Sequence, residues 1–156
     1  MAKNGPILIV EDDQADRDLL ETAFREAHVS NSIIFFGNGA ALIKHLKASL
    51  QVPFIILCDV NLPREDAVHF RLEMEHDEML NSMKTPFIFY TSYQSEYAVI
   101  EVYKNLTVQG FFQKNNPAIE LKDTLRLITD YWKICREPVP QNIIAKAWLV
   151  FLLPWW

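Results

Sequence analysis

One unbroken apolar run, the five residues from Phe54 to Cys58, constrains the fold of this chain more than any other feature. Pro53 precedes the run, and Asp59 follows it directly. Because apolar and polar side chains do not alternate, the run predicts a strand buried on both faces, as in the centre of a parallel sheet. Asp59 would then lie at the carboxyl end of that strand, where open α/β sheets bind ligands. A carboxylate there can also simply cap a turn, so the other strands must decide.

Further apolar runs predict strands that alternate with helices along the whole chain. The predicted strands are 7–10, 32–36, 54–59, 87–91 and 110–114, and the predicted helices are 14–28, 40–50, 66–80, 95–106 and 117–134. Asp13 is the candidate N-cap of the first helix, and Asp16 lies in its first turn, where negative charge is favourable. Five alternations of strand and helix favour an α/β fold with helices on both faces of a parallel sheet.

Composition narrows the class of protein. The length of 156 residues fits one domain, and a formal net charge of −5 without a Lys/Arg cluster argues against a nucleic-acid partner. Cys58 and Cys135 have neither CxxC nor zinc-ligand spacing, so we expect free thiols in a reducing compartment. Because no apolar signal segment precedes the first strand, the sequence favours a cytoplasmic location.

Polar side chains follow the apolar part of four predicted strands, and these ends meet at one edge of a parallel sheet. Several carboxylates in one small site need a counter-charge, and Mg²⁺ prefers such oxygen ligands. A lysine and a hydroxyl beside a metal-bound carboxylate can bind a phosphoryl group, and the carboxylate itself can be the nucleophile. The residues are Glu11, Asp12 and Asp13, then Asp59, Thr91 and Lys114.

Each of these residues also has an ordinary structural interpretation. Lys114 alone could be a surface ion-pair partner, and Thr91 alone could form a turn. The coincidence at four matching strand ends favours a phosphoryl-binding site.

Four segments in order resemble the receiver domain of bacterial two-component response regulators, and the resemblance covers about residues 5 to 136. It implies a flavodoxin-like five-stranded parallel sheet in the order 2-1-3-4-5. The pattern Asp59-x-Asn61-Leu62-Pro63 in the second segment is typical of single-domain regulators without a DNA-binding output domain. The segments are Ile7-Leu8-Ile9-Val10-Glu11-Asp12-Asp13, Asp59-Val60-Asn61-Leu62-Pro63, Thr91-Ser92 and Gly110-Phe111-Phe112-Gln113-Lys114.

The resemblance implies a metal and phosphoryl site. Asp59 matches the phospho-acceptor and a ligand of Mg²⁺. Asp12 matches a direct ligand of Mg²⁺, and Glu11 matches a ligand that acts through water. Asn61 matches the position whose backbone carbonyl binds the metal. Lys114 matches the lysine that pairs with the phosphoryl group.

The resemblance also implies a switch. Thr91 matches the hydroxyl that reads the phosphoryl group, and Phe111 matches the aromatic residue whose rotamer follows it. Two positions depart from the family. Asn115 follows Lys114 where a cis proline is usual, and Ala67 stands where glycine is common. A cis bond before a residue other than proline costs about 2.5–4 kcal/mol, so the placement of Lys114 is open at this point.

The implied function is a phospho-accepting signalling domain rather than an enzyme with a separate substrate. A sensor histidine kinase or phosphotransfer protein would supply the phosphoryl group. The helix 95–106, strand 110–114 and helix 117–134 would present it to a partner protein. One alternative is a pseudo-receiver that only docks, which the intact acidic residues oppose. Another is a Mg²⁺-dependent phosphatase, which would want a second aspartate where Asn61 stands.

The tail, residues 138–156, differs from the predicted receiver domain at 1–137. Pro138 and Pro140 break the preceding helix, and one charge, Lys146, interrupts the apolar stretch 143–156. This stretch is shorter than the ~20 residues that span a bilayer. We expect it to pack on a receiver surface, its own or that of a second copy. The alternatives are attachment to a membrane surface through its tryptophans, and a segment that is not native to the protein.

Overall fold

The computed structural model describes residues 2–49, 51–62, 67–91, 109–114 and 119–135. The helix predicted over 95–106 and the tail, residues 138–156, lie outside the described residues. The strands are β1 (Ile7–Val10), β2 (Ile33–Phe36), β3 (Ile55–Cys58), β4 (Phe87–Thr91) and β5 (Gly110–Gln113). The helices are α1 (Gln14–Glu26), α2 (Gly39–Ala48), α3 (Ala67–His76), α4 (Glu78–Ser82) and α6 (Leu121–Ile134).

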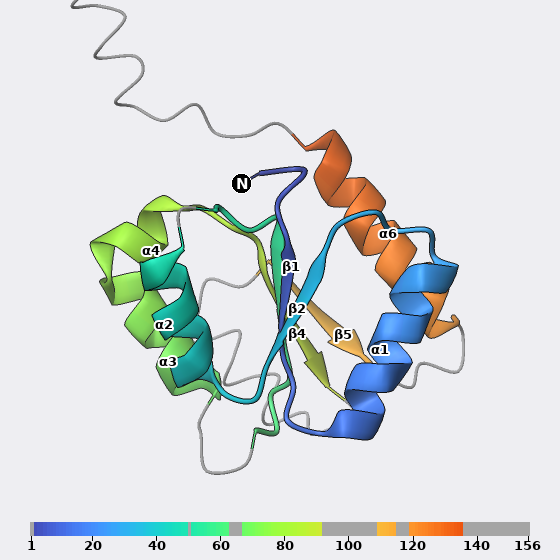
Figure 1. The fold of residues 1–156 in the computed structure, drawn as a ribbon, viewed down its shortest axis with the longest axis horizontal. Helices are drawn as coiled ribbons and strands as arrows, with labels where there is room; N and C mark the ends of the chain where they lie inside the picture. Colours follow the sequence, from blue (N-terminus) through green and yellow to red (C-terminus); the bar gives the residue numbers. More distant parts are fainter. Residues whose placement is uncertain (1, 50, 63–66, 92–108, 115–118, 136–156) are drawn as a thin grey trace, which may run out of the picture.

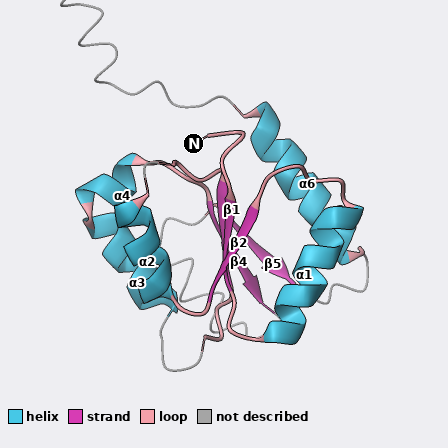
Figure 2. Cartoon of the chain, viewed as in Figure 1, coloured by secondary structure: helices cyan, strands magenta, loops and turns pink. Residues whose placement is uncertain are grey.

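The five strands form one sheet in the order β2-β1-β3-β4-β5, and every neighbouring pair is parallel. The flavodoxin-like order 2-1-3-4-5 predicted from the sequence is therefore confirmed. Helices α1 and α6 cover one face of the sheet, and α2, α3 and α4 cover the other (Figure 1). Figure 2 shows the strands enclosed between these two helical layers.

The sheet separates two hydrophobic clusters. Leu8, Ile56 and Phe87 belong to the cluster that includes residues of α2 and α3, whereas Ile7 and Ile55 belong to the cluster that includes residues of α1 and α6. Successive strand residues thus enter opposite clusters, which explains why the strands read as unbroken apolar runs. Burying one such side chain contributes roughly 1.5–3 kcal/mol to the stability of the fold. Packing of helices on both faces therefore stabilises the sheet whose carboxyl edge carries the polar residues.

Side-chain caps begin the helices that follow β1 and β2. The Asp13 carboxylate accepts a hydrogen bond from the backbone N–H of Asp16 (3.0 Å), which confirms the predicted N-cap of α1. Asn38 caps α2 in the same way through the N–H of Ala41 (2.8 Å). Each cap lies shortly after its strand, so the chain turns directly from the carboxyl edge of the sheet into the next helix.

Two predicted helix boundaries were wrong. The helix predicted over 66–80 is two helices, because the Asp77 carboxylate accepts hydrogen bonds from the N–H groups of Met79 and Leu80 and starts α4. Phe70 and Leu80 both belong to the same core cluster, so the apolar pattern continues across the break and does not reveal it. The last helix begins at Leu121 rather than at residue 117, since Glu120 has an extended backbone.

Within the described part of the chain, no helix is both long and apolar enough to cross a membrane.

Candidate functional site

The strand register places Glu11 beside Asp59. Val10 of β1 pairs with Cys58 of β3, so the next residue on each strand lies one step further toward the same edge. The ladder continues past both strands, because the N–H of Asp59 donates to the carbonyl of Val10 and the N–H of Glu11 donates to the carbonyl of Phe36, each at 3.0 Å. Backbone hydrogen bonds therefore fix both acidic residues at the carboxyl edge of the sheet.

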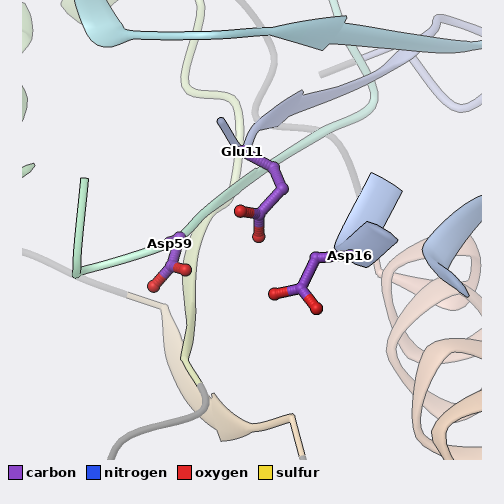
Figure 3. Close-up of side chains that lie close together, drawn as sticks. All are labelled: Glu11, Asp16 and Asp59. Atoms are coloured by element: carbon purple, nitrogen blue, oxygen red, sulfur yellow. The ribbon is translucent and has the colours of Figure 1, made fainter. Parts of the chain in front are cut away.

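Three carboxylates converge at this edge. Glu11, Asp16 and Asp59 each offer one oxygen, and these oxygens lie within 4.8 Å of one another. Figure 3 shows the three side chains pointing toward a common centre from the ends of β1 and β3 and from the first turn of α1. The side chains of Glu11 and Asp59 are only 2% and 8% exposed, whereas that of Asp16 is 36% exposed.

Lys114 holds the three carboxylates together. Its Nζ donates to Glu11 Oε2, to Asp16 Oδ2 at 2.5 Å and to Asp59 Oδ2 at 2.8 Å. An ammonium group has three N–H donors, so each donor has one carboxylate acceptor. The backbone N–H of Lys114 donates to the carbonyl of Thr91 at 2.8 Å, which continues the pairing of β5 with β4. This backbone bond fixes Lys114 at the end of β5, from where its side chain reaches Asp59.

The site carries an excess of negative charge, because three carboxylates surround one ammonium group. Burial raises the pKa of Glu11, and the hydrogen bond from Lys114 opposes this increase. Burial alone would lower the pKa of Lys114, but hydrogen bonds to Asp16, Asp59 and Glu11 outweigh it and hold the pKa above its ordinary value. The lysine is therefore charged at neutral pH, and a formal charge of −2 remains in the group of four side chains.

A second set of contacts connects Asp59 with β4. Asp59 Oδ1 accepts a hydrogen bond from the backbone N–H of Asn61 at 3.0 Å. The side-chain amide of Asn61 then donates to the hydroxyl of Thr91 at 2.8 Å, and Thr91 is buried. The two oxygens of Asp59 are thus held by different groups, the N–H of Asn61 and the ammonium group of Lys114.

Phe111 lies on β5, the neighbour of β4 in the sheet. It is half-buried, packs against the cluster that includes α2 and α3, and its ring centroid is 6.5 Å from that of Phe89. Lys114 is the residue that directly follows this strand, so the aromatic ring and the buried lysine are three positions apart. The Lys114–Asn115 peptide bond lies outside the described residues.

The residues that gather differ from the predicted set in two positions. Asp12, predicted as a direct metal ligand, has an exposed side chain and is not one of the three converging carboxylates. Asp16, whose sequence position predicts only a favourable charge in the first turn of α1, is one of them. The signal was present, because a helix that begins at the carboxyl edge of the sheet carries its first turn into the site.

The donor set fits a hard divalent cation. Carboxylate oxygens are the ligands that Mg²⁺ and related ions prefer, and the excess negative charge favours a cation of charge +2. Such a cation and the ammonium group of Lys114 would compete for the same oxygens of Glu11 and Asp59.

Comparisons with known proteins identify the family of the chain and agree with its fold. A family model described as the response regulator receiver domain matches residues 7–126. The response regulator Rcp1 of Synechocystis is 26% identical over 131 residues, which cover 81% of this chain and 87% of that protein. The Mn²⁺-bound form of Rcp1 has a TM-score of 0.66 at 24% identity, covering 86% of this chain and 99% of that structure. The phosphorylated cyanobacterial phytochrome response regulator RcpA has a TM-score of 0.72 at 22% identity, covering 86% and 97%.

Proposed function

The chain belongs to the response regulator receiver domain family, and on this basis we propose that it accepts a phosphoryl group onto Asp59 in a Mg²⁺-dependent reaction. The observation that carries the proposal is the buried Asp59 carboxylate, held 2.8 Å from the ammonium group of Lys114 and close to two further carboxylates. A carboxylate fixed in this way can act as a nucleophile, and an adjacent lysine can neutralise phosphoryl oxygens.

A sensor histidine kinase or a phosphotransfer protein supplies the phosphoryl group. An oxygen of Asp59 forms a bond to phosphorus while the bond between phosphorus and the donor's imidazole nitrogen breaks. The electron pair of that bond stays on the imidazole nitrogen. Asn61 orients the carboxylate through its backbone N–H, and Lys114 contacts the transferred group. We propose a cytoplasmic location for this protein, where it would meet such a phosphoryl donor.

Mg²⁺ is the proposed cofactor. Glu11, Asp12, Asp59 and the backbone carbonyl of Asn61 are its proposed ligands. Glu11 and Asp59 are two of the three converging carboxylates, which supports a cation beside them. When bound, the ion neutralises charge on the phosphoryl oxygens. The related protein Rcp1 is described in a Mn²⁺-bound form, which is consistent with this proposal. The chemistry of the domain is then limited to gain and loss of its own phosphoryl group.

The direct test is incubation of the purified protein with acetyl phosphate and Mg²⁺, followed by mass spectrometry to locate the phosphoryl group. A single addition on the peptide that contains Asp59 is expected. A chain that stays unmodified with acetyl phosphate and with a histidine kinase would instead be a pseudo-receiver that only docks.

Thr91 is proposed to report phosphorylation rather than to enable it. Its hydroxyl contacts the Asn61 side chain, and β4 lies between Asp59 and Phe111 in the sheet. We expect Thr91→Ala to accept phosphate at Asp59 with a rate within about threefold of the unmodified protein. NMR spectra with a phosphoryl mimic should lose the shift at Phe111 in this variant, because the connecting hydroxyl is gone. An undiminished shift would contradict the switch role.

The proposed output face includes β5 and α6. On α6, Leu127, Tyr131 and Ile134 are exposed large apolar or aromatic side chains at helical spacing, and Ile134 is 80% exposed. Such a stripe favours contact with another apolar surface. We propose three partners for this stripe: a downstream protein, a second copy of this chain, or the tail. Binding of the tail to a membrane surface is the less favoured alternative.

Truncation after Glu137 tests the role of the tail. We expect the shortened protein to fold and to accept phosphate, because residues of the site and of both core clusters lie before this point. Its oligomeric state should change in light scattering, since removal of the apolar tail exposes or removes a contact surface. An unchanged molecular mass together with lost binding to anionic vesicles would favour membrane attachment. Loss of folding would mean that the tail belongs to the core.

A further inference from the structure

Asp16 contacts the proposed phosphorylation site from outside the sheet. It lies in the first turn of α1, and its Oδ2 is 2.5 Å from the Nζ of Lys114. Its backbone N–H donates to the carboxylate of Asp13, so the N-cap of the helix fixes its position. The resemblance to the receiver family assigns this residue no role, and Asp16 is much more exposed than the other two carboxylates around Lys114.

The proposed reaction places two demands on Lys114. In the structure its ammonium group donates to Glu11 and Asp59, whose oxygens the cation and the phosphorus atom must also reach. Two positive charges that share one set of oxygens repel each other. Lys114 must therefore release these oxygens and still remain close enough to meet the phosphoryl group.

Asp16 supplies an acceptor that satisfies both demands. It keeps one donor of the ammonium group engaged when Glu11 and Asp59 become unavailable, and it belongs to α1 rather than to either strand. We propose that Asp16 is a positioning residue that holds Lys114 beside the reaction centre during phosphoryl transfer. This inference rests on the proposed function and concerns a residue beyond the family's acidic pair.

The rate of Asp59 phosphorylation by acetyl phosphate at saturating Mg²⁺ is the first measurement. We expect Asp16→Asn to slow it about five- to tenfold, because a hydrogen bond between charged groups is lost at a partly exposed position. Asp16→Glu should recover the rate to within about threefold. Asp18→Asn removes the same charge from an exposed position on the same helix and should stay within twofold. An unchanged rate in Asp16→Asn would overturn the proposal.

A double-mutant cycle separates positioning from direct metal binding. In a Lys114→Met background, Asp16→Asn should lower the phosphorylation rate no more than Asp18→Asn does. The same should hold for the Mg²⁺ affinity, measured by calorimetry. If Asp16 ligates the cation itself, the full decrease persists without Lys114, and the positioning role is refuted.

A third measurement does not depend on phosphorylation. In the full chain without Mg²⁺, the NMR signals of the Lys114 side chain, assigned with Lys114→Met, should shift in Asp16→Asn and remain unchanged in Asp18→Asn. If the unmodified protein takes up no phosphoryl group, the proposed function fails while this experiment still tests the contact. If the Lys114 signals do not respond to Asp16→Asn, the contact is absent and the inference is wrong.

Discussion

Asp59→Asn should abolish phosphorylation by acetyl phosphate and Mg²⁺, with incorporation expected to fall at least a hundredfold. The amide has nearly the same shape as the carboxylate, so it can still accept from the N–H of Asn61. It lacks the negative charge and the nucleophilic oxygen that form the bond to phosphorus. The measurement is the stoichiometry of phosphoryl groups per chain, with the product identified by its lability to hydroxylamine, as expected of an acyl phosphate.

The matched control is Asp18→Asn, which removes one exposed carboxylate from α1 outside the site. It should label like the unmodified protein, so that a change in net charge alone cannot explain the loss. Normal labelling of Asp59→Asn would transfer the acceptor role to another residue and refute the assignment.

Lys114→Met should be the substitution at the site with the largest cost in stability. It leaves three carboxylates within 4.8 Å of one another without a counter-charge, two of them almost fully buried. Removing one partner of a buried ion pair costs about 3–5 kcal/mol, and the partial exposure of Asp16 favours the lower end. Urea denaturation at neutral pH without Mg²⁺ should therefore show a decrease of about 3 kcal/mol in the free energy of unfolding.

Two conditions should reduce this loss. Burial already raises the pKa of Glu11, and removal of the ammonium group raises it further. An acid with a raised pKa destabilises the fold above that pKa, and the penalty disappears below the unfolded value of about 4.3. The difference between variant and unmodified protein should thus shrink as the pH falls toward 4. Added Mg²⁺ should stabilise Lys114→Met more than the unmodified protein, because the ion no longer competes with the lysine.

Lys122→Met is the control for loss of a lysine. Lys122 pairs with one exposed carboxylate, Glu120, at 2.7 Å on the surface of the molecule. Its removal should leave the urea midpoint nearly unchanged, since exposed ion pairs contribute little. An equally small effect of Lys114→Met would mean that the carboxylates at the sheet edge carry less charge than their geometry indicates.

The apolar pattern predicted most of the fold because burial on both faces leaves a local signature. The run from Phe54 to Cys58 is unbroken since its successive side chains enter clusters on opposite sides of the sheet. The same pattern could not locate the end of α3, because Asp77 breaks the helix through bonds to its own following N–H groups while the apolar spacing continues.

Family resemblance supplied the order of strands, and the structure agrees with it. Asp59, Glu11, Thr91 and Lys114 also lie together, as expected of side chains at the same edge of a parallel sheet. Their chemical roles remain proposals. The ends of the strands can be predicted from the sequence, because each strand has its own apolar run and ends close to where that run ends.

The contacts of Asp16 and Asn61 were decided by the tertiary structure alone. Asp16 and Lys114 are separated by 98 positions in the sequence, and Asn61 and Thr91 by 30. The first turn of a helix that begins at this edge is expected near the site, but the sequence does not show that Asp16 reaches the buried lysine while Asp12 is exposed. The sequence determined which strand ends carry charge, because burial periodicity is a property of neighbouring residues. Which carboxylates surround Lys114 depends on how α1 leaves the sheet and on the register of β1, β3 and β5, and these are fixed only when the whole sheet is assembled.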